Sequence, residues 1–197
     1  MKQKYDFEIY FNDCLSDSIS TIENIKKYSE IIKLISEKIA DTLNSGRKLM
    51  LCGNGGSAAD CQHLSAEFTG RFIKDRKPLA AITLTTDTSA ITSIANDYSF
   101  KEIFSRQIEA IGIRGDCLIV ISSSGNSENV INAVNCANEL GIITIGLLGC
   151  DGGILAKICN FKFIVPSHIT ARIQEAHTLI GHIICGTVEQ RLELVDF

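Results

Sequence analysis

Two side chains that can hold a metal ion or move a proton, His63 and Glu67, lie four residues apart. Residues with this spacing share one face of a helix, so the imidazole and the carboxylate can act on the same ligand. The spacing allows a pair of metal ligands, or a carboxylate base that a histidine orients. An exposed ion pair on a helix surface has the same spacing, so the pair alone does not decide between these interpretations.

A second group of such side chains, Gln174, His177 and His182, lies in one helical stretch near the end of the chain. At about 100° per residue, Gln174 and His182 are two turns plus about 80° apart, so they flank one cleft only from opposite ends of a two-turn stretch. His177 falls on a different side, and we expect a surface or hydrogen-bonded histidine there. His182 lies in the apolar run from Leu179 to Cys185, where a satisfied core histidine is the usual expectation.

Two loops have the composition of anion sites. Residues 52–60 read CGNGGSAAD, and the glycines let backbone N–H groups approach a ligand at a helix N-terminus. A simple tight turn would have the same composition. Residues 122–127 read SSSGNS, and four hydroxyls at a helix N-terminus suit a phosphate monoester. Ser124 or Asn126 could instead cap the helix, but one cap does not need four serines, so we predict phosphate binding.

A third polar pair, Asn96 and Asp97, ends a helical stretch over residues 89–95. Helix capping explains the asparagine, whereas the neighbouring carboxylate has the chemistry to bind sugar hydroxyls. Both interpretations stay open from the residues alone.

Five short, nearly continuous apolar runs alternate with helical stretches. The runs cover residues 49–52, 79–84, 117–121, 142–148 and 161–165. Such runs are typical of a parallel sheet covered on both faces, and the alternation predicts a doubly wound α/β fold with ligands at the carboxyl ends of the strands. Apolar residues at helical spacing between residues 6 and 44 predict two N-terminal helices. We expect a single domain over residues 1–197, in which residues 1–45 serve oligomerisation and residues 46–197 form the α/β core.

Composition narrows the possible partners and the compartment. The 197 residues have a formal net charge of −4 and no run of lysine or arginine, so nucleic acid is not expected as a direct ligand. Eight cysteines without a CxxC pair indicate reduced thiols rather than a metal or disulfide framework. The first residues lack the apolar stretch of a signal peptide, and no segment approaches the ~20 apolar residues of a membrane span. We therefore expect a cytoplasmic protein that does not contact a membrane.

Four motifs together resemble the phosphoheptose isomerase family of SIS domains. They are CGNGGSAADCQHLSAEFTGR at residues 52–71, IANDY at 94–98, ISSSGNS at 121–127, and ARIQEAH at 171–177 with a histidine five residues further on. The first motif is long and highly specific. The resemblance implies an SIS-type fold and an aldose–ketose isomerase that converts sedoheptulose 7-phosphate to D-glycero-D-manno-heptose 7-phosphate. That reaction is the first step of heptose precursor synthesis for lipopolysaccharide or capsule.

The resemblance also implies roles for individual residues. Implied substrate contacts are Asn54, Gly55, Gly56, Ser57, Glu67, Asn96, Asp97, Ser122, Ser123, Ser124, Ser127 and Gln174, with the serines of the second loop on the phosphate. Implied zinc ligands, for one ion per subunit, are His63, Glu67, Gln174 and His182. Glu67 would move the carbon-bound proton, and His182 would serve ring opening or the oxygen proton. Family members are homotetramers, which implies a tetramer here.

Two other function classes compete with the enzyme. A non-catalytic SIS protein would use the fold to bind a phosphosugar or a replication-initiator partner, and a sensor would bind a sugar phosphate without turnover. The joint presence of Glu67, Gln174 and His182 favours the enzyme.

Overall fold

The computed structural model of the chain describes residues 6–195. Residues 1–5, which belong to the segment inspected for a signal peptide, and residues 196–197 lie outside the described residues. The centre of the fold is a five-stranded, all-parallel sheet with strand order β2-β1-β3-β4-β5. Its strands are β1 (Leu49–Gly53), β2 (Ala81–Thr83), β3 (Cys117–Ser122), β4 (Ile143–Leu148) and β5 (Phe161–Ile164). Each predicted strand is confirmed to within two residues at its ends.

Alternate residues of each central strand enter two separate hydrophobic cores. In β3, Cys117, Ile119 and Ile121 pack into one core, whereas Leu118 and Val120 pack into the other. Successive side chains of a strand point to opposite faces, so a strand covered on both sides is apolar throughout. This two-sided burial is the physical reason for the unbroken apolar runs in the sequence.

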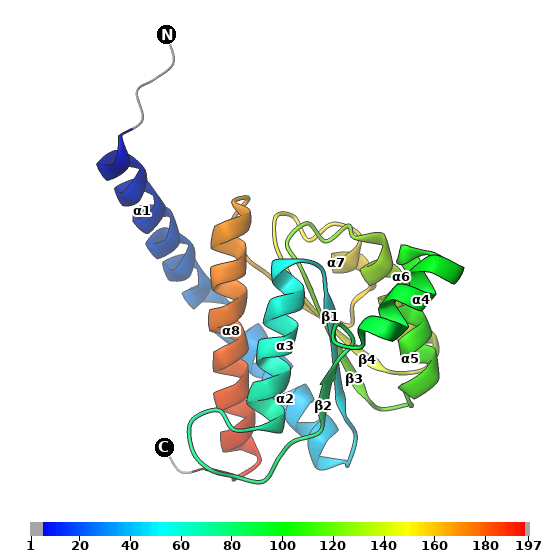
Figure 1. Cartoon of the computed structure of the whole chain (residues 1–197). Coiled ribbons are helices and arrows are strands. Elements are labelled where there is room, and N and C mark those ends of the chain that lie inside the picture. Colours follow the sequence, from blue (N-terminus) through cyan, green and yellow to red (C-terminus); the bar gives the residue numbers. More distant parts are fainter. Residues whose placement is uncertain (1–5, 196–197) are drawn as a thin grey trace.

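Helices cover both faces of the sheet, which confirms the doubly wound α/β architecture (Figure 1). One face is covered by α2 (Ser29–Asn44), α3 (Gly56–Thr69) and α8 (Thr170–Arg191). The other face is covered by α4 (Thr88–Asp97), α5 (Ser105–Ile111), α6 (Glu128–Glu139) and α7 (Leu155–Ile158). Short 3-10 helices, η1 (Lys26–Tyr28) and η2 (Phe100–Glu102), join neighbouring helices.

The two expected N-terminal helices are α1 (Phe7–Ile25) and α2, joined through η1. The carboxylate of Asp6 caps α1 by accepting hydrogen bonds from the backbone N–H groups of Glu8 and Ile9. Most of α1 projects beyond the rest of the domain (Figure 1), and its apolar side chains are largely exposed. Within residues 6–195, no helix has the length and apolar character needed to cross a membrane.

His177 on α8 is fully buried, so the expectation of a surface position is wrong and the hydrogen-bonded alternative holds. Its Nε2 donates to the backbone oxygen of Leu148, at the end of β4, over 3.0 Å, and its Nδ1 has no partner. Burial lowers the pKa of His177 to about 4 because desolvation disfavours the imidazolium, although the hydrogen bond to Leu148 opposes this shift. The folded protein therefore holds this histidine neutral.

Stability should fall as the solution is acidified from neutral pH. Below the ordinary histidine pKa of 6.5 the unfolded chain takes up a proton that native His177 does not bind until about pH 4. The contribution of neutral His177 to the free energy of unfolding is thus fully present above pH 6.5 and is lost as the pH falls from 6.5 to about 4. Between pH 7 and pH 5 we expect a loss of about 2 kcal/mol from His177.

The substitution His177→Gln keeps a donor for the Leu148 carbonyl but does not titrate. Urea unfolding at pH 7 and pH 5 should show a smaller loss of unfolding free energy for this variant than for the unmodified chain. An equal loss in both proteins would rule out His177 as the source of the pH dependence.

Candidate active site

The candidate site is built on α3 and α8, which lie side by side on one face of the sheet (Figure 1). The Thr178 hydroxyl donates to Asp60 Oδ1 over 2.9 Å, and one turn further along both helices His63 Nε2 lies 2.7 Å from His182 Nε2. Because residue numbers rise together along the contact, the helices run parallel. Burial raises the pKa of Asp60, while the hydrogen bond from Thr178 and the neighbouring His63 act in the opposite direction.

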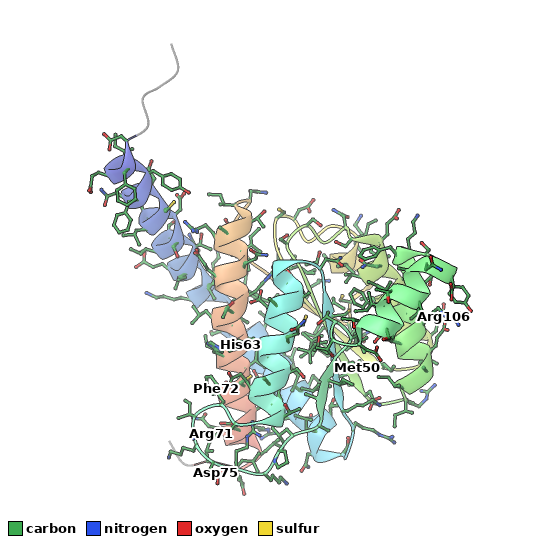
Figure 2. The ribbon with its side chains drawn as sticks, in the orientation of Figure 1. Met50, His63, Arg71, Phe72, Asp75 and Arg106 are labelled. Atoms are coloured by element: carbon green, nitrogen blue, oxygen red, sulfur yellow. The ribbon has the colours of Figure 1, made fainter. Side chains whose placement is uncertain are left out.

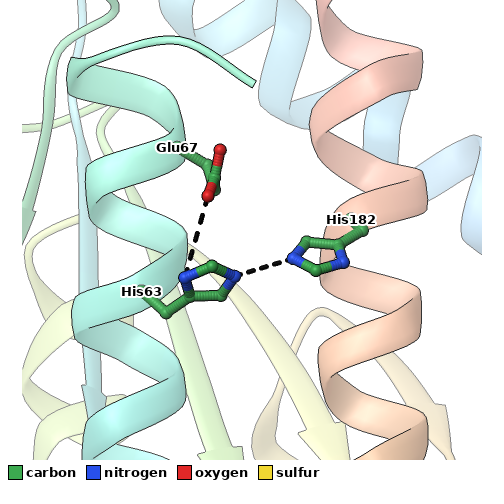
Figure 3. A group of neighbouring side chains, drawn as sticks. All are labelled: His63, Glu67 and His182. Carbon is green, nitrogen blue, oxygen red and sulfur yellow. Dashed lines mark hydrogen bonds and ion pairs between the residues drawn. The ribbon is translucent and has the colours of Figure 1, made fainter. Parts of the chain in front are cut away.

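His63, Glu67 and His182 form a compact cluster between the two helices (Figure 3). One potential ligand atom from each residue lies within 4.8 Å of the other two. His63 contacts His182 through Nε2 and faces Glu67 Oε1 through Nδ1, at 3.7 Å. The side chains of His63 and Glu67 are 44% and 20% exposed, so a small molecule from solvent can reach the cluster. His182, more than 100 residues further along the chain, thus joins the pair of His63 and Glu67 that the sequence analysis identified on one helix face.

The donor set of this cluster fits a divalent transition metal. Two imidazole nitrogens and a carboxylate oxygen are ligands that zinc accepts. The facing Nε2 atoms of His63 and His182 also need a proton or a cation between their lone pairs, because two bare lone pairs at 2.7 Å repel. Two nitrogens on one tetrahedral zinc lie about 3.3 Å apart, so a small separation of the rings would admit an ion.

Gln174 lies two turns before His182, with its amide against the start of α3. A Cβ built on Gly56 would lie 2.3 Å from Gln174 Nε2, so a larger residue there would displace the end of the Gln174 side chain. Gly55 is the N-cap of α3 with φ of +57°, and no side chain caps this helix. The backbone N–H groups of Ser57 and Ala58 donate to the carbonyls of Asn54 and Gly55, so an anion at this N-terminus would compete with these bonds. Ser57, just inside the helix, is buried.

The serine loop leaves the N-terminus of α6 without a side-chain cap. The N-cap residue is Ser127, which makes no capping hydrogen bond, so the alternative that Ser124 or Asn126 caps this helix is wrong. Within the loop, Ser122 Oγ accepts the N–H of Gly125 and Ser124 Oγ accepts the N–H of Asn126. Ser123 and Ser127 are half-buried, and Ser124 is exposed.

A pair of asparagines ties the two loops together. The side-chain amides of Asn54, after β1, and Asn129, in the first turn of α6, donate to each other over 2.8 and 2.9 Å. The sequence analysis missed Asn129, whose only signal was a polar residue on the otherwise apolar buried face of α6. The amide of Asn54 is engaged in this contact, so it fixes the spacing of the loops.

The structure places Asn96 and Asp97 on α4, which covers the opposite face of the sheet from α3 and α8. The helix continues through Asp97 and its C-cap is Tyr98, so the capping interpretation of Asn96, one of the two left open by the sequence, is wrong. Asn96 donates to the Asp97 carboxylate over 2.7 Å, and both side chains are exposed. Within this chain, the two residues therefore stand apart from the His63, Glu67 and His182 cluster.

Comparison with known proteins identifies the family. Residues 12–149 match the SIS domain family. A phosphoheptose isomerase from Clostridium acetobutylicum is 54% identical over 187 residues, which cover 92% of this chain and 95% of that protein. One from Aquifex aeolicus is 51% identical, with 84% and 87% covered. The chain belongs to the phosphoheptose isomerase family of SIS domain proteins.

Solved structures of phosphoheptose isomerases support the same assignment. The enzyme from Neisseria gonorrhoeae superimposes with a TM-score of 0.90 at 41% identity, and the match covers 94% of this chain and all of that one. The enzyme from Francisella tularensis gives a TM-score of 0.91 at 35% identity. The family, the fold class and the isomerase activity predicted from the motifs are confirmed by these similarities.

Replacing Gly125 by alanine should disrupt the serine loop. Gly125 has φ of +67°, and a Cβ there would lie 2.0 Å from the backbone oxygen of Gly152. Gly46 also has positive φ, +74°, but nothing lies within 4 Å of its Cβ position. Gly46→Ala therefore measures the cost of a positive φ without a steric collision, which is about 1 kcal/mol of unfolding free energy.

We expect Gly125→Ala to lose about 3 kcal/mol of unfolding free energy, because a backbone collision adds to the strain. Its binding of inorganic phosphate should weaken as well, whereas Gly46→Ala should bind phosphate normally. Thermal unfolding and calorimetric phosphate titration measure the two effects. If Gly125→Ala and Gly46→Ala had equal stability and equal affinity for phosphate, the serine loop would not be the phosphate site.

Proposed function

We propose that this member of the phosphoheptose isomerase family converts sedoheptulose 7-phosphate to D-glycero-D-manno-heptose 7-phosphate, the first step of heptose precursor synthesis for a bacterial surface polysaccharide. The observation that carries the proposal is the cluster of His63, Glu67 and His182 in a chain whose relatives are named phosphoheptose isomerases. The cluster supplies both kinds of group that the reaction needs, a carboxylate base and an imidazole.

The phosphate of the substrate would bind at the N-terminus of α6. The uncapped helix end offers backbone N–H groups, and Ser122, Ser123, Ser124 and Ser127 offer hydroxyls. These donors are neutral, so they hold a phosphate monoester without the strong attraction of a buried cation. The sugar chain would extend past the loop of residues 54–57 toward Glu67 and Gln174. Asn96 and Asp97 stand apart from the cluster within one chain, so they would hold sugar hydroxyls at a site to which a neighbouring subunit brings them.

Proton transfer would be divided between two side chains. Aldose–ketose isomerisation removes a proton from the carbon beside a carbonyl and returns it to the neighbouring carbon through an enediol, while a second proton moves between the two oxygens. Glu67, partly exposed at the helix surface, would take and return the carbon-bound proton. His182, facing it from α8, would move the oxygen proton or open the sugar ring (Figure 3).

One zinc ion per subunit would be held by His63, Glu67 and His182. Gln174, the further ligand that the family resemblance implies, has its amide at the start of α3 and would have to move to reach the ion. The support is the donor set and the opposed Nε2 atoms described above. When bound, zinc supplies Lewis-acid polarisation of a carbonyl oxygen. A carboxylate has two oxygens, so Glu67 retains an acceptor for the substrate proton when the other oxygen is a ligand.

The chain would work as a cytoplasmic homotetramer. The support for assembly is the exposure of large apolar side chains along α1, where Phe7, Ile9, Leu15 and Ile19 are all about half exposed or more. Surfaces of this kind are typical of protein–protein contacts.

The reaction is tested with sedoheptulose 7-phosphate and a single conservative substitution. Glu67→Gln removes the base but keeps the size of the side chain, and it should lower kcat at least ~100-fold. Glu139→Gln, at the exposed end of α6, is the matched control and should retain full activity. Formation of the aldose followed by NMR provides the measurement. Tight binding of the sugar phosphate without turnover by the unmodified protein would point to a sensor instead.

Metal removal tests the role of zinc separately. Treatment with a chelator should abolish turnover, and added zinc should restore it, with about one ion bound per chain. The substitution His63→Ala should prevent zinc binding while circular dichroism shows a folded protein. Full activity in protein with no measurable metal would refute the zinc requirement.

A further inference from the structure

The loop after α3, residues 70–80, is anchored by an arginine outside the proposed chemistry. The Arg76 side chain is only 1% exposed, and its guanidinium donates to the backbone oxygens of Glu67 (2.6 Å), Phe68 (2.8 Å), Gly70 (3.0 Å) and Lys77 (3.1 Å). The bonds to Glu67 and Phe68 satisfy carbonyls in the last turn of α3, where the helix supplies no N–H partner. One of them belongs to the peptide of Glu67, the proposed base.

Arg76 is paired across the helix interface with Glu189 on α8. Arg76 Nε donates to Glu189 Oε1 over 2.6 Å, and the same oxygen accepts the N–H of Phe72 over 3.3 Å. Glu189 is completely buried. It follows His182 by seven residues, almost two full turns, so the two side chains leave nearly the same face of α8. A single carboxylate thus anchors the loop to the helix that carries His182.

The same loop also contacts His182 directly. The ring of Phe72 lies 5.4 Å from the His182 ring, centroid to centroid, with an angle of 34° between the planes. Gly186 lies next to the same ring, and a Cβ there would make ordinary van der Waals contact with Phe72 at 3.4 Å. Figure 2 labels Arg71, Phe72 and Asp75 along this loop beside the lower ends of α3 and α8.

We propose that Arg76 and Glu189 are positioning residues for the metal-binding cluster. Through their ion pair they fix the backbone of Glu67 on α3 relative to His182 on α8, and through Phe72 they restrict the His182 ring. Neither residue needs to touch substrate or metal. The proposal rests on the proposed function of the cluster and adds to it the contacts that set its geometry.

A role in stability alone would have a different signature. If Arg76 only caps α3, its replacement lowers the melting temperature, but the folded protein binds zinc with unchanged affinity. If it positions the cluster, zinc affinity and kcat fall even where the protein is fully folded. Loss of an outer contact to a metal site typically costs 10- to 100-fold in affinity or activity, which sets the expected range.

The decisive comparison is Glu189→Gln against Glu189→Met. Both variants remove the charge at nearly constant volume, but only glutamine keeps an oxygen that can accept from Arg76 and Phe72. Zinc affinity, measured by competition with a chromophoric chelator at a temperature where both are folded, should stay within about threefold for Gln and fall 10- to 100-fold for Met. Arg76→Lys, which keeps the charge but loses the fork of donors, should resemble the methionine variant.

Asp116→Asn is the control for destabilisation without a change at the site. Asp116 is fully buried and paired with Lys48 at the start of β3, the opposite end of that strand from the serine loop. This variant should lose stability but keep its zinc affinity and kcat.

Unchanged zinc affinity in folded Glu189→Met or Arg76→Lys overturns the proposal. If only one of the variants Arg76→Lys and Glu189→Met folds, the zinc affinity of that variant decides. Absence of zinc binding by the unmodified protein would overturn this proposal together with the zinc site. Absence of turnover with sedoheptulose 7-phosphate would overturn only the proposed reaction, because zinc affinity is measured without substrate.

Discussion

A glycine on α8 allows this helix to lie directly against α3. At Gly181 any side chain would collide with Leu64, since a Cβ there would lie 2.5 Å from the leucine Cδ2. This close approach brings His63 and His182 within hydrogen-bonding distance and lets Thr178 reach Asp60. A wider spacing would leave two half-sites, each too far from the other for one ion or one substrate carbon to touch both. The proposed chemistry therefore depends first on helix packing and only then on the identity of the reactive groups.

The sheet imposes the second constraint. In a parallel sheet every strand ends at the same edge, so the loops after β1 and β3, which are adjacent strands, must lie next to each other. The two hydrogen bonds between the Asn54 and Asn129 amides then hold the loop after β1 at a fixed distance from the start of α6. Two uncapped helix N-termini then face one region of the surface, and an acidic chain with a net charge of −4 can attract a phosphate there through backbone dipoles alone.

The sequence predicted the sheet well because burial on both faces leaves an unmistakable apolar run, as in β3. It also predicted that His63 and Glu67 share a helix face, since that relation is local. The pattern within each element did not predict which residues meet across elements; only the family resemblance implied that His63, Glu67 and His182 meet. The pairing of Arg76 with Glu189 and of Asn54 with Asn129 depends on how α3, α6 and α8 pack, and periodicity within one helix has no information about the neighbouring helix. The burial of His177 was uncertain for the same reason, because the surface it meets belongs to β4.

The distance along the chain between the two halves of the cluster has a consequence during protein synthesis. His63 and His182 are 119 residues apart, and α8 is the last helix within the described residues 6–195. A nascent chain on the ribosome can form β1 and α3 early, but it has no cluster until α8 has left the exit tunnel and docked. Before that moment the apolar face of α3 lacks its cover, and a chain truncated ahead of α8 would be a target for chaperones and proteases rather than a partly active enzyme. Assembly of the cluster thus waits for the synthesis and docking of α8.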